Sequence, residues 1–437
     1  MRKRALGSLA VVLALAACAS AGSKDPFVGF GPNPVLPKPQ KALLPTLNAP
    51  KAVGWTQGQA PKAPPGFVVT PFAAGLAHPR WIYVLPNGDV LVAQSSSEPH
   101  KPKGFRDWIA QRVQKNAGAL MESPNNIILL RDADGDGIAE VRDTFAQGLQ
   151  RPTGMALLGQ TLFVANDNAL VRLPYTQGQT RIDGAAVKVV DLPSGINHHW
   201  VKNVVAAPDG SKLYVSVGSN SNIAENGFPA EEDRAAIHQL NPDGSGMRLF
   251  ASGLRNPNGM DFEPATGALW TAVNERDELG NDLVPDYMTS VREGAFYGWP
   301  YSYYGQNVDE RVQPQKPDLV ARAIPPDYAL GPHTASLGLT FYRGTAFPAR
   351  YQGGVFIGQH GSWNRSPLNG YRVVFVPFAS GRPAGAPEAF LTGFVSDNGK
   401  RVFGRPVGVA VDARGGLLVA DDAGKTVWRV APARSSP

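Results

Sequence analysis

The stretch Asp209-Gly210-Ser211-Lys212-Leu213-Tyr214-Val215-Ser216-Val217 joins a tight, glycine-containing turn to a short run rich in apolar and β-branched residues. This pattern is typical of a β-strand that follows a hairpin turn. Five further segments repeat it, at residues 87–93, 159–165, 266–272, 353–358 and 414–420. The repetition predicts a series of similar β-units rather than two unrelated domains.

A second repeated element, a glycine-containing turn that carries His or Arg, lies shortly before each of these segments. Its copies are residues 75–79, 148–154, 195–199, 253–259, 331–335 and 403–408. A turn, an inner strand, a hairpin and a second strand, repeated six times, predict an all-β fold, a six-bladed β-propeller. The longer spacings after the first and fourth units leave room for short helical insertions, one of them expected within residues 104–118.

The composition agrees with this fold. Among 437 residues there are 48 Gly and 39 Pro, about a fifth of the chain, which indicates many turns and few long helices. The single Cys excludes a disulfide framework and every metal site that needs several Cys ligands.

The N-terminus has the pattern of an export signal. Arg2, Lys3 and Arg4 precede the apolar residues 5–17, a run too short to span a membrane as a stable helix. Residues 1–17 are therefore predicted to be a signal peptide. The only Cys follows in Leu15-Ala16-Ala17-Cys18, which resembles a bacterial lipoprotein box and predicts lipidation of Cys18. The alternative is ordinary cleavage after residues 19–21.

Either form of export predicts a periplasmic protein, and lipidation would anchor it to a bacterial membrane. Removal of residues 1–17 lowers the formal charge from +6 to +3, so a nucleic-acid partner is not expected. Residues 18–65 are rich in Pro and are expected to form a tether that wraps the domain or holds it away from the membrane. The propeller is expected to span residues 66–435.

In a propeller, turns that lead into the innermost strands meet at one end of the axis. The polar residues of the six turns are therefore expected to converge; they are His78, Arg151, His199, Arg255 with Asn256, His333 and Arg405. So many cationic and imidazole groups at one place predict an anionic ligand. The alternative is that each Arg only hydrogen-bonds neighbouring carbonyls. His360 follows the fifth repeated strand, and an imidazole in a partly dry channel is a candidate general base.

Two acidic segments are candidate cation sites. Carboxylates at loop positions 1, 3, 5, 9 and 12, with the backbone carbonyl at position 7, match a Ca²⁺ loop. The residues at these positions are Asp132, Asp134, Asp136, Glu140, Asp143 and, at position 7, Ile138. The alternative is an acidic turn without an ion. Residues 273–282, which include Glu275 and Arg276, form either a second cation site with main-chain oxygens or a salt-bridged turn.

Several ordered motifs over residues 66–432 resemble the glucose/sorbosone dehydrogenase family, in particular its L-sorbosone dehydrogenase-like branch. These motifs are His198-His199, residues 209–220, Leu254-Arg255-Asn256-Pro257-Asn258-Gly259, residues 274–280, Tyr297-Gly298-Trp299-Pro300, His360-Gly361-Ser362-Trp363-Asn364-Arg365 and residues 404–409. The resemblance implies a propeller that binds pyrroloquinoline quinone (PQQ), a tricarboxylate ortho-quinone, together with Ca²⁺.

The resemblance also implies roles for individual residues. His199 would take the proton from the substrate hydroxyl while hydride passes from C1 to the quinone, and Arg255 would stabilise charge on the quinone oxygen. Asn256 and Arg405 would hold the cofactor, and backbone oxygens at Glu275 and Arg276 would bind Ca²⁺. The family's cofactor-binding Lys has no counterpart, so Arg365 or His360 is expected to replace it. His333 is expected near the cofactor face.

The expected activity is oxidation of a sugar or sugar aldehyde, such as an aldose or L-sorbosone. A haem-attachment motif is missing from the sequence, so a separate quinone or cytochrome is expected to accept the electrons. Two alternatives are a Ca²⁺-dependent lactonase and a non-catalytic binding propeller. The lactonase would need carboxylates and Asn around one axial ion, whereas these turns carry mainly His and Arg.

Overall fold

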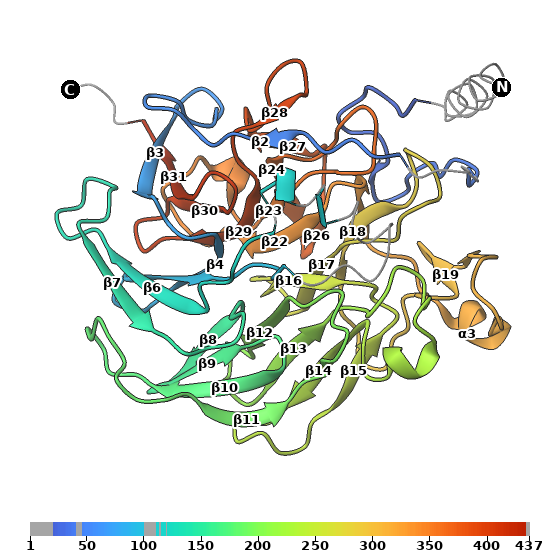
Figure 1. Cartoon of the computed structure of the whole chain (residues 1–437), viewed down its shortest axis with the longest axis horizontal. Helices are drawn as coiled ribbons and strands as arrows, with labels where there is room; N and C mark the ends of the chain where they lie inside the picture. The colour runs from blue at the N-terminus through green and yellow to red at the C-terminus, as the bar shows by residue number, and fades with distance from the viewer. Residues whose placement is uncertain (1–20, 41–45, 100–110, 113–114, 119, 434–437) are drawn as a thin grey trace, which may run out of the picture.

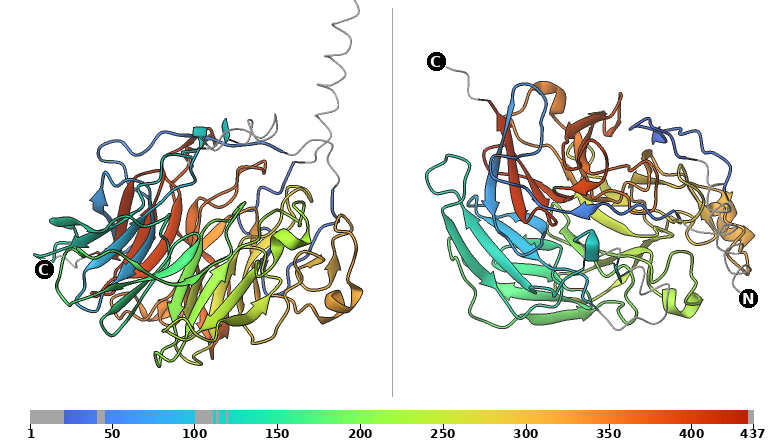
Figure 2. Two further views of the ribbon diagram at one scale, coloured as in Figure 1. Left: turned by 60° about the horizontal axis from the view of Figure 1, so that its bottom comes forward. Right: turned by 45° about the horizontal axis from the view of Figure 1, so that its top comes forward.

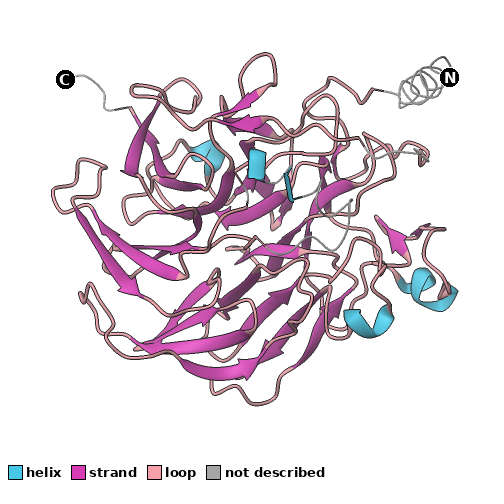
Figure 3. Cartoon of the chain, viewed as in Figure 1, coloured by secondary structure: helices cyan, strands magenta, loops and turns pink. Residues whose placement is uncertain are grey.

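The computed structural model describes residues 21–40, 46–99, 111–112, 115–118 and 120–433. Antiparallel sheets stand around a common axis as blades (Figure 1). Strands make up most of the regular structure, and the helices are short (Figure 3). The predicted six-bladed β-propeller is confirmed.

Each blade has four principal strands, which follow one another in the sheet in the order stated. Blade 1 contains β4 (Pro79–Val84), β5 (Val90–Gln94), β6 (Asn126–Arg131) and β7 (Val141–Ala146). Blade 2 contains β8 (Met155–Leu158), β9 (Thr161–Ala165), β10 (Ala169–Pro174) and β11 (Val187–Asp191). Blade 3 contains β12 (Lys202–Ala206), β13 (Leu213–Val217), β14 (Ala236–Leu240) and β15 (Arg248–Ser252).

Blade 4 contains β16 (Pro257–Phe262), β17 (Leu269–Val273), β18 (Pro285–Ser290) and β21 (Tyr328–Pro332). Blade 5 contains β22 (Ser336–Phe341), β23 (Val355–Gln359), β24 (Arg372–Val376) and β27 (Glu388–Leu391). Blade 6 contains β29 (Pro406–Val411), β30 (Leu417–Asp421), β31 (Thr426–Pro432) and β3 (Phe67–Ala74).

The six repeated segments of the sequence form the second strand of each blade: β5, β9, β13, β17, β23 and β30. Every residue of β5, β17, β23 and β30 is buried. Because neighbouring blades cover both faces of these strands, they are apolar along most of their length instead of alternating. The first strands ring the axis, with β4 beside β29, β8 beside β12 and β16 beside β22.

The ring is closed by strands from the two ends of the chain. β3 pairs with β31 in antiparallel register, from Phe67 opposite Pro432 to Ala74 opposite Thr426. Figure 1 shows β3, in blue, beside β31, in red. Blade 6 therefore needs both ends of the propeller sequence, and this pairing resists opening of the ring.

The Pro-rich segment before the propeller lies along the blades (Figure 2). β1 (Phe30–Gly31) pairs with β21, and β2 (Lys51–Ala52) pairs in parallel with β28 (Arg401–Val402). The Trp55 ring packs against Phe394, Phe403 and Trp428. Residues 21–40 and 46–65 thus wrap the domain, one of the two arrangements expected for this segment.

The remaining elements are short. They are β19 (Ser302–Tyr303), β20 (Asn307–Val308), β25 (Phe378–Ala379), β26 (Arg382–Pro383), α3 (Pro317–Arg322) and the 3-10 turns η2 (Phe228–Glu231) and η3 (Ala349–Tyr351). The helix expected within residues 104–118 lies largely outside the described residues, but residues 111–112 and 115–116 are helical. Cys18 and the signal segment also lie outside them. Within the described ranges, no helix has the length and apolarity needed to cross a membrane.

Candidate functional site

The six His- and Arg-bearing turns lie at one end of the propeller axis. Each leads into the first strand of a blade, namely β4, β8, β12, β16, β22 or β29. We call this end, lined by residues 75–79, 148–154, 195–199, 253–259, 331–335 and 403–408, the mouth. His78, Arg151 and His333 have φ values of 60°, 42° and 56°. This left-handed conformation is unfavourable for residues with a Cβ, so its recurrence supports the equivalence of these turns.

His199 has one ring nitrogen fixed by the backbone. Its Nδ1 lies 2.8 Å from the carbonyl oxygen of Ser219 and 3.0 Å from Ser219 Oγ, which itself donates to the Ser221 carbonyl at 2.7 Å. A carbonyl can only accept, so Nδ1 carries the proton and Nε2 keeps its lone pair. Burial, followed by the charges of Arg255 and His198, holds the pKa of His199 well below its usual value. The imidazole is therefore neutral at neutral pH.

Gly218 allows His199 to sit at this position. A Cβ at residue 218 would lie 2.3 Å from Asn256 Oδ1 and 2.7 Å from His199 Cβ. Both distances are well inside van der Waals contact. The residue that follows β13 must therefore be glycine, because the chain there passes between the His199 and Arg255 turns.

Arg255 is held rigidly beside His199. Its guanidinium is 2% exposed and donates to Asn222 O at 3.1 Å, Asn222 Oδ1 at 3.0 Å and Glu275 O at 2.7 Å. The carboxylate of Asp277 lies 3.5 Å away. The next residue, Asn256, is buried and its Oδ1 has no hydrogen-bond partner within the described chain. The mouth thus contains a fixed cation and, beside it, an unsatisfied polar atom.

Asp277 links Arg255 to His333. His333 Nε2 donates to the Gly280 carbonyl at 2.9 Å, and Nδ1 lies 3.4 Å from Asp277. Burial would lower the pKa of His333, but the hydrogen bond and charge of Asp277 outweigh it and raise the pKa. Burial would raise the pKa of Asp277, but His333 and Arg255 lower it to about 2. Both nitrogens of His333 thus have partners in the described chain, Gly280 and Asp277, and its expected contact with a cofactor stays a prediction.

A second buried carboxylate, Asp422, joins the first of these turns to His360, and His360 in turn contacts Arg405. His360 Nε2 lies 2.8 Å from Asp422 Oδ2, and Arg80 Nη1 lies 2.6 Å from the same oxygen. Arg405 donates to the carbonyls of His360 and Gly361, both at 2.9 Å. Burial, followed by the charge of Arg405, lowers the pKa of His360 to about 3. His360 is therefore neutral and donates its Nε2 proton to Asp422.

The turn of residues 148–154, which carries Arg151, contacts the others through Trp200, the residue after His199. The guanidinium carbons of Arg80 and Arg151 lie 5.7 and 5.4 Å from the centre of its ring, within cation–π range. Arg151 also pairs with Asp167. The alternative expectation for the arginines thus holds in part, because Arg255 and Arg405 do bind neighbouring carbonyls.

Arg365, expected as a cofactor contact, lies outside this network. Its guanidinium donates to the carbonyls of Asn281 at 2.8 Å, Pro367 at 2.6 Å and Ser23 at 2.8 Å, and to the carboxylate of Asp282 at 2.6 Å. Four of its donor directions are therefore occupied. Its observed role is to fasten the N-terminal segment to blades 4 and 5.

The segment expected to bind Ca²⁺ at the mouth has a different arrangement. The Glu275 carboxylate accepts from Arg276 N and Nε, and Arg276 also donates to Pro300 O, Ser302 O and Asp309. The Glu275 carbonyl, an expected Ca²⁺ ligand, already accepts from Arg255. A cation bound to this oxygen would lie against a guanidinium. This arrangement does not fit the expected calcium site, and the salt-bridged turn describes it better.

The other candidate cation site is partly assembled. Ligand atoms of Asp132, Asp134, Asp136 and Glu140 lie within 4.8 Å of one another, with no ion present. Asp143 lies apart from them on β7, opposite Leu129, so position 12 of the expected loop is not used. Arg414 also forms an ion pair with Asp132. The side chain of Ile138 is exposed, and only its carbonyl was expected to serve as a ligand.

Four residues beside the mouth received no individual role from the sequence: Arg80, Ser219, Asp277 and Asp422. Ser219 and Asp422 stand shortly after the second strand of a blade, as His360 does. A polar residue at this position in several repeats was the signal that could have found them. Asp277 lies in the acidic segment 273–282, whereas Arg80 carries no comparable signal in the sequence.

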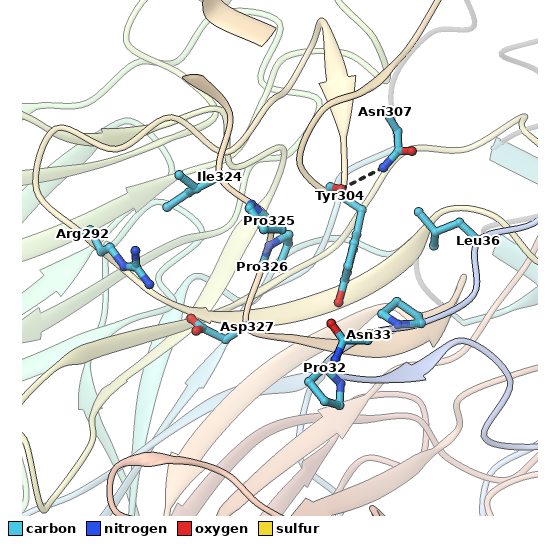
Figure 4. A pocket seen from close by; sticks show the side chains of 11 residues that line it. Pro32, Asn33, Leu36, Arg292, Tyr304, Asn307, Ile324, Pro325, Pro326 and Asp327 are labelled. Carbon is cyan, nitrogen blue, oxygen red and sulfur yellow. Dashed lines mark hydrogen bonds between the residues drawn. The ribbon is translucent and has the colours of Figure 1, made fainter. Parts of the chain in front are cut away.

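A separate cavity of about 570 Å³ lies at the outer edge of blade 4, away from these residues (Figure 4). Pro32, Leu36, Tyr304 and Asp327 are among its lining residues, and none of the mouth residues lines it. It is formed where the N-terminal segment crosses the insertion between β18 and β21.

Comparison with known proteins gives two family matches. The family model described as glucose/sorbosone dehydrogenase matches residues 160–364, and a second family model, described as TrAA12-like, matches residues 307–433. An uncharacterised protein of Borreliella burgdorferi is 35% identical over 370 residues, 80% of this chain and 95% of that protein. The aldose sugar dehydrogenase of Escherichia coli is 30% identical over 131 residues, 29% of this chain and 33% of that protein.

A solved structure shares the fold. The holo form of the pyranose dehydrogenase PQQ domain from Coprinopsis cinerea superposes with a TM-score of 0.66 and 20% sequence identity. The match covers 87% of this chain and 99% of that one.

Proposed function

The chain belongs to the glucose/sorbosone dehydrogenase family, and from this membership we propose that it is a PQQ-dependent dehydrogenase of a sugar or sugar aldehyde, such as an aldose or an L-sorbosone-like compound. The observation that carries the proposal is the state of His199. Its Nδ1 proton is committed to Ser219, while Nε2 has a lone pair and no partner among the described residues.

His199 is suited to act as the base. Its low pKa keeps the imidazole neutral at neutral pH, so Nε2 can accept the proton of the hydroxyl at C1 or of an aldehyde hydrate. The positive charge that then forms on the ring is shared through Nδ1–H with the Ser219 carbonyl. Gly218 and Ser219 hold the ring in one orientation, so little reorganisation is needed as the proton moves.

The residues of the mouth fit a polycarboxylate cofactor. Arg255 and Arg405 are each at least nine-tenths buried, and Asn256 Oδ1 is buried without a partner in the described chain. A buried polar atom without a partner is costly, so a ligand that supplies the missing hydrogen bond of Asn256 would complete the site. When bound, PQQ supplies the quinone that accepts hydride from C1. Arg255, locked by Asn222 and Glu275, would provide a fixed positive charge for it, and Asn256 and Arg405 would hold its polar edge.

We do not assign Ca²⁺ to the carbonyls of Glu275 and Arg276, because the Arg255 guanidinium already occupies the Glu275 carbonyl. We propose instead that Asp132, Asp134, Asp136 and Glu140 bind one Ca²⁺ as a structural ion in the connection between β6 and β7. Oxygen atoms within 4.8 Å of one another suit a hard cation. Arg414 would release Asp132 when the ion binds.

We also propose that the protein is exported and anchored to a bacterial membrane through lipid on Cys18. Electrons would leave to a separate quinone or cytochrome. A lactonase is disfavoured because the carboxylates of the mouth, Asp167, Asp277 and Asp422, each pair with an arginine or histidine and do not surround an axial ion.

The proposal is tested with the exported protein, residues 18–437, incubated with PQQ. Dye reduction is followed over a panel of aldoses, L-sorbosone and simple alcohols, for the wild type, His199→Gln and a control, Arg343→Gln. Arg343 pairs with Asp261 at the surface, where its side chain is 45% exposed. We expect turnover in the wild type and control, and a loss of about 100-fold or more in His199→Gln.

His199→Gln is informative because glutamine retains a side-chain N–H for Ser219 and cannot act as a base. Absence of dye reduction in the wild type with every substrate would refute the proposed activity. Equal turnover in the wild type and His199→Gln would refute the role of His199.

A further inference from the structure

The junction between blades 1 and 6 holds a group of polar side chains that the proposed mechanism does not use. We call it the Asp422 cluster; it consists of His78, Arg80, His360 and Asp422. The Asp422 carboxylate lies 2.6 Å from Arg80 Nη1, 2.8 Å from His360 Nε2 and 3.7 Å from His78 Nε2. All four residues are at least nine-tenths buried.

Two nitrogen atoms of the Asp422 cluster are unsatisfied. Arg80 Nε and His78 Nε2 are buried and have no hydrogen-bond partner in the described part of the chain. His78 Nδ1 is occupied by the Ser95 carbonyl at 2.7 Å. A buried guanidinium N–H without an acceptor is strongly unfavourable, and native proteins rarely retain one unless it has a use.

The charges of the cluster leave room for one more anion. Burial lowers the pKa values of His78 and His360, so both rings are neutral. A second guanidinium, that of Arg405, lies beside this cluster: Arg80 pairs with Asp422, whereas Arg405 donates to the His360 carbonyl and forms no ion pair within the described chain. One additional carboxylate would balance the second guanidinium.

The position of Arg80 connects the cluster to the base. Arg80 is the second residue of β4, directly after the turn that carries His78. Its guanidinium lies over the ring of Trp200, and Trp200 follows His199 in the chain. The indole N–H donates to Ser97 Oγ at 2.7 Å, which fixes the ring. Arg80 therefore contacts the residue next to the base.

We propose that Arg80 is a carboxylate-binding residue of the cofactor site, and that its Nε–H receives one carboxylate of the cofactor while its Nη1 stays on Asp422. Asp422 then acts as a positioning residue that aims the guanidinium. The inference rests on the proposed function, because it takes PQQ as the ligand.

The test is an equilibrium titration of the apoprotein with PQQ, followed by the absorbance of the bound quinone and by tryptophan fluorescence. It compares the wild type, Arg80→Lys, Arg80→Gln and the surface control Arg343→Gln. Lysine keeps the charge and a partner for Asp422 but lacks the fork of N–H groups. We expect both Arg80 variants to bind PQQ at least about tenfold more weakly, with the control unchanged.

Thermal unfolding of each apoprotein separates folding from binding. If Arg80→Gln fails to fold because Asp422 loses its partner, the PQQ affinity of Arg80→Lys provides the test. Wild-type affinity in a folded Arg80→Lys would refute the inference and leave the proposed function intact. Failure of the wild type itself to bind PQQ would refute the proposed function, and the role of Arg80 with it.

Discussion

The close approach of Gly218 to the base gives the sharpest test of the site. In Gly218→Ala, the new methyl group would start 2.7 Å from His199 Cβ and 2.3 Å from Asn256 Oδ1. Carbon atoms in contact are normally separated by about 3.5 Å or more, so the His199 turn must retreat by somewhat less than about 1 Å. The Asn256 amide can rotate away more easily, because its Oδ1 has no partner in the described chain to lose.

A displacement of this size is large for catalysis and moderate for stability. A misplacement of about 1 Å can lower kcat about 100-fold, whereas overpacking of this kind costs about 1–3 kcal/mol of unfolding free energy. We therefore expect kcat to fall between about tenfold and about 100-fold, with a smaller change in the affinity for PQQ. Initial rates of dye reduction measure kcat, and thermal unfolding measures stability.

Gly184→Ala is the matched control. It makes the same chemical change at a position where a Cβ would have no neighbour within 4 Å and where φ is not in the left-handed region. This variant should match the wild type in both measurements. If Gly218→Ala turned over as fast as Gly184→Ala, the position of His199 would not depend on its packing against residue 218.

Titration of the mouth and of the acidic loop can be measured as well. His199 must be neutral to accept a proton, and its pKa is well below the usual value. We therefore expect kcat to stay level as the pH falls through about 6.5, the ordinary pKa of histidine. A drop in kcat centred at that pH would contradict the assignment of His199 as the base. Asp277→Asn should lower the unfolding free energy by about 2 kcal/mol. The pair contributes fully above the usual pKa of Asp277, near 3.8, and is lost as the pH falls toward about 2. On the alkaline side, the contribution of His333 weakens as the pH rises through its raised pKa. Urea unfolding of the wild type and Asp277→Asn between about pH 4 and about pH 8 should therefore show the largest difference in stability at the acid end. A difference that stays constant over this range would refute the coupling of Asp277 to His333. Finally, Ca²⁺ should raise the melting temperature of the wild type by a few degrees and leave that of Asp134→Asn unchanged; an equal rise in both would exclude the Asp132 loop.

The fold could be predicted because the information for it is local and repeated. Each second strand carries a run of buried apolar residues bounded by turn residues, as Leu417–Asp421 does, and six copies reinforce one another. The closing pair of β3 and β31 was not foreseen. It joins the first and last strands of the propeller, and a period along the chain does not indicate which ends pair.

The site could be predicted in part for the same reason. His199, Arg255 and Arg405 lie in the repeated turns, so their convergence at the mouth follows from the fold. Arg365 shares a motif with His360, but the loop turns its guanidinium toward Ser23 and Asp282. That direction depends on the N-terminal segment, which no repeat describes.

Asp143 illustrates a second limit. Spacing alone placed it at the last position of a Ca²⁺ loop, but the strand register of β7 sets it opposite Leu129. A loop motif that runs into a strand ends where backbone pairing begins, because the side chains of a strand alternate between its faces. Spacing could therefore indicate only the first four carboxylates of this candidate site.

The segment before the propeller is part of the same construction as the mouth. Trp55 donates to Asp421 Oδ2 at 2.7 Å, and the backbone N–H of Arg405 donates to Asp421 Oδ1 at 2.7 Å. Burial raises the pKa of Asp421 to about 6, so this carboxylate depends on its N–H donors to remain charged near neutral pH. The wrapping segment thus supplies one of the donors to Asp421, the carboxylate that holds the backbone of Arg405. The Arg405 guanidinium is in turn oriented by the carbonyls of His360 and Gly361. This Pro-rich region, which was expected either to wrap the domain or to hold it away from a membrane, supports the cationic side of the mouth through these contacts.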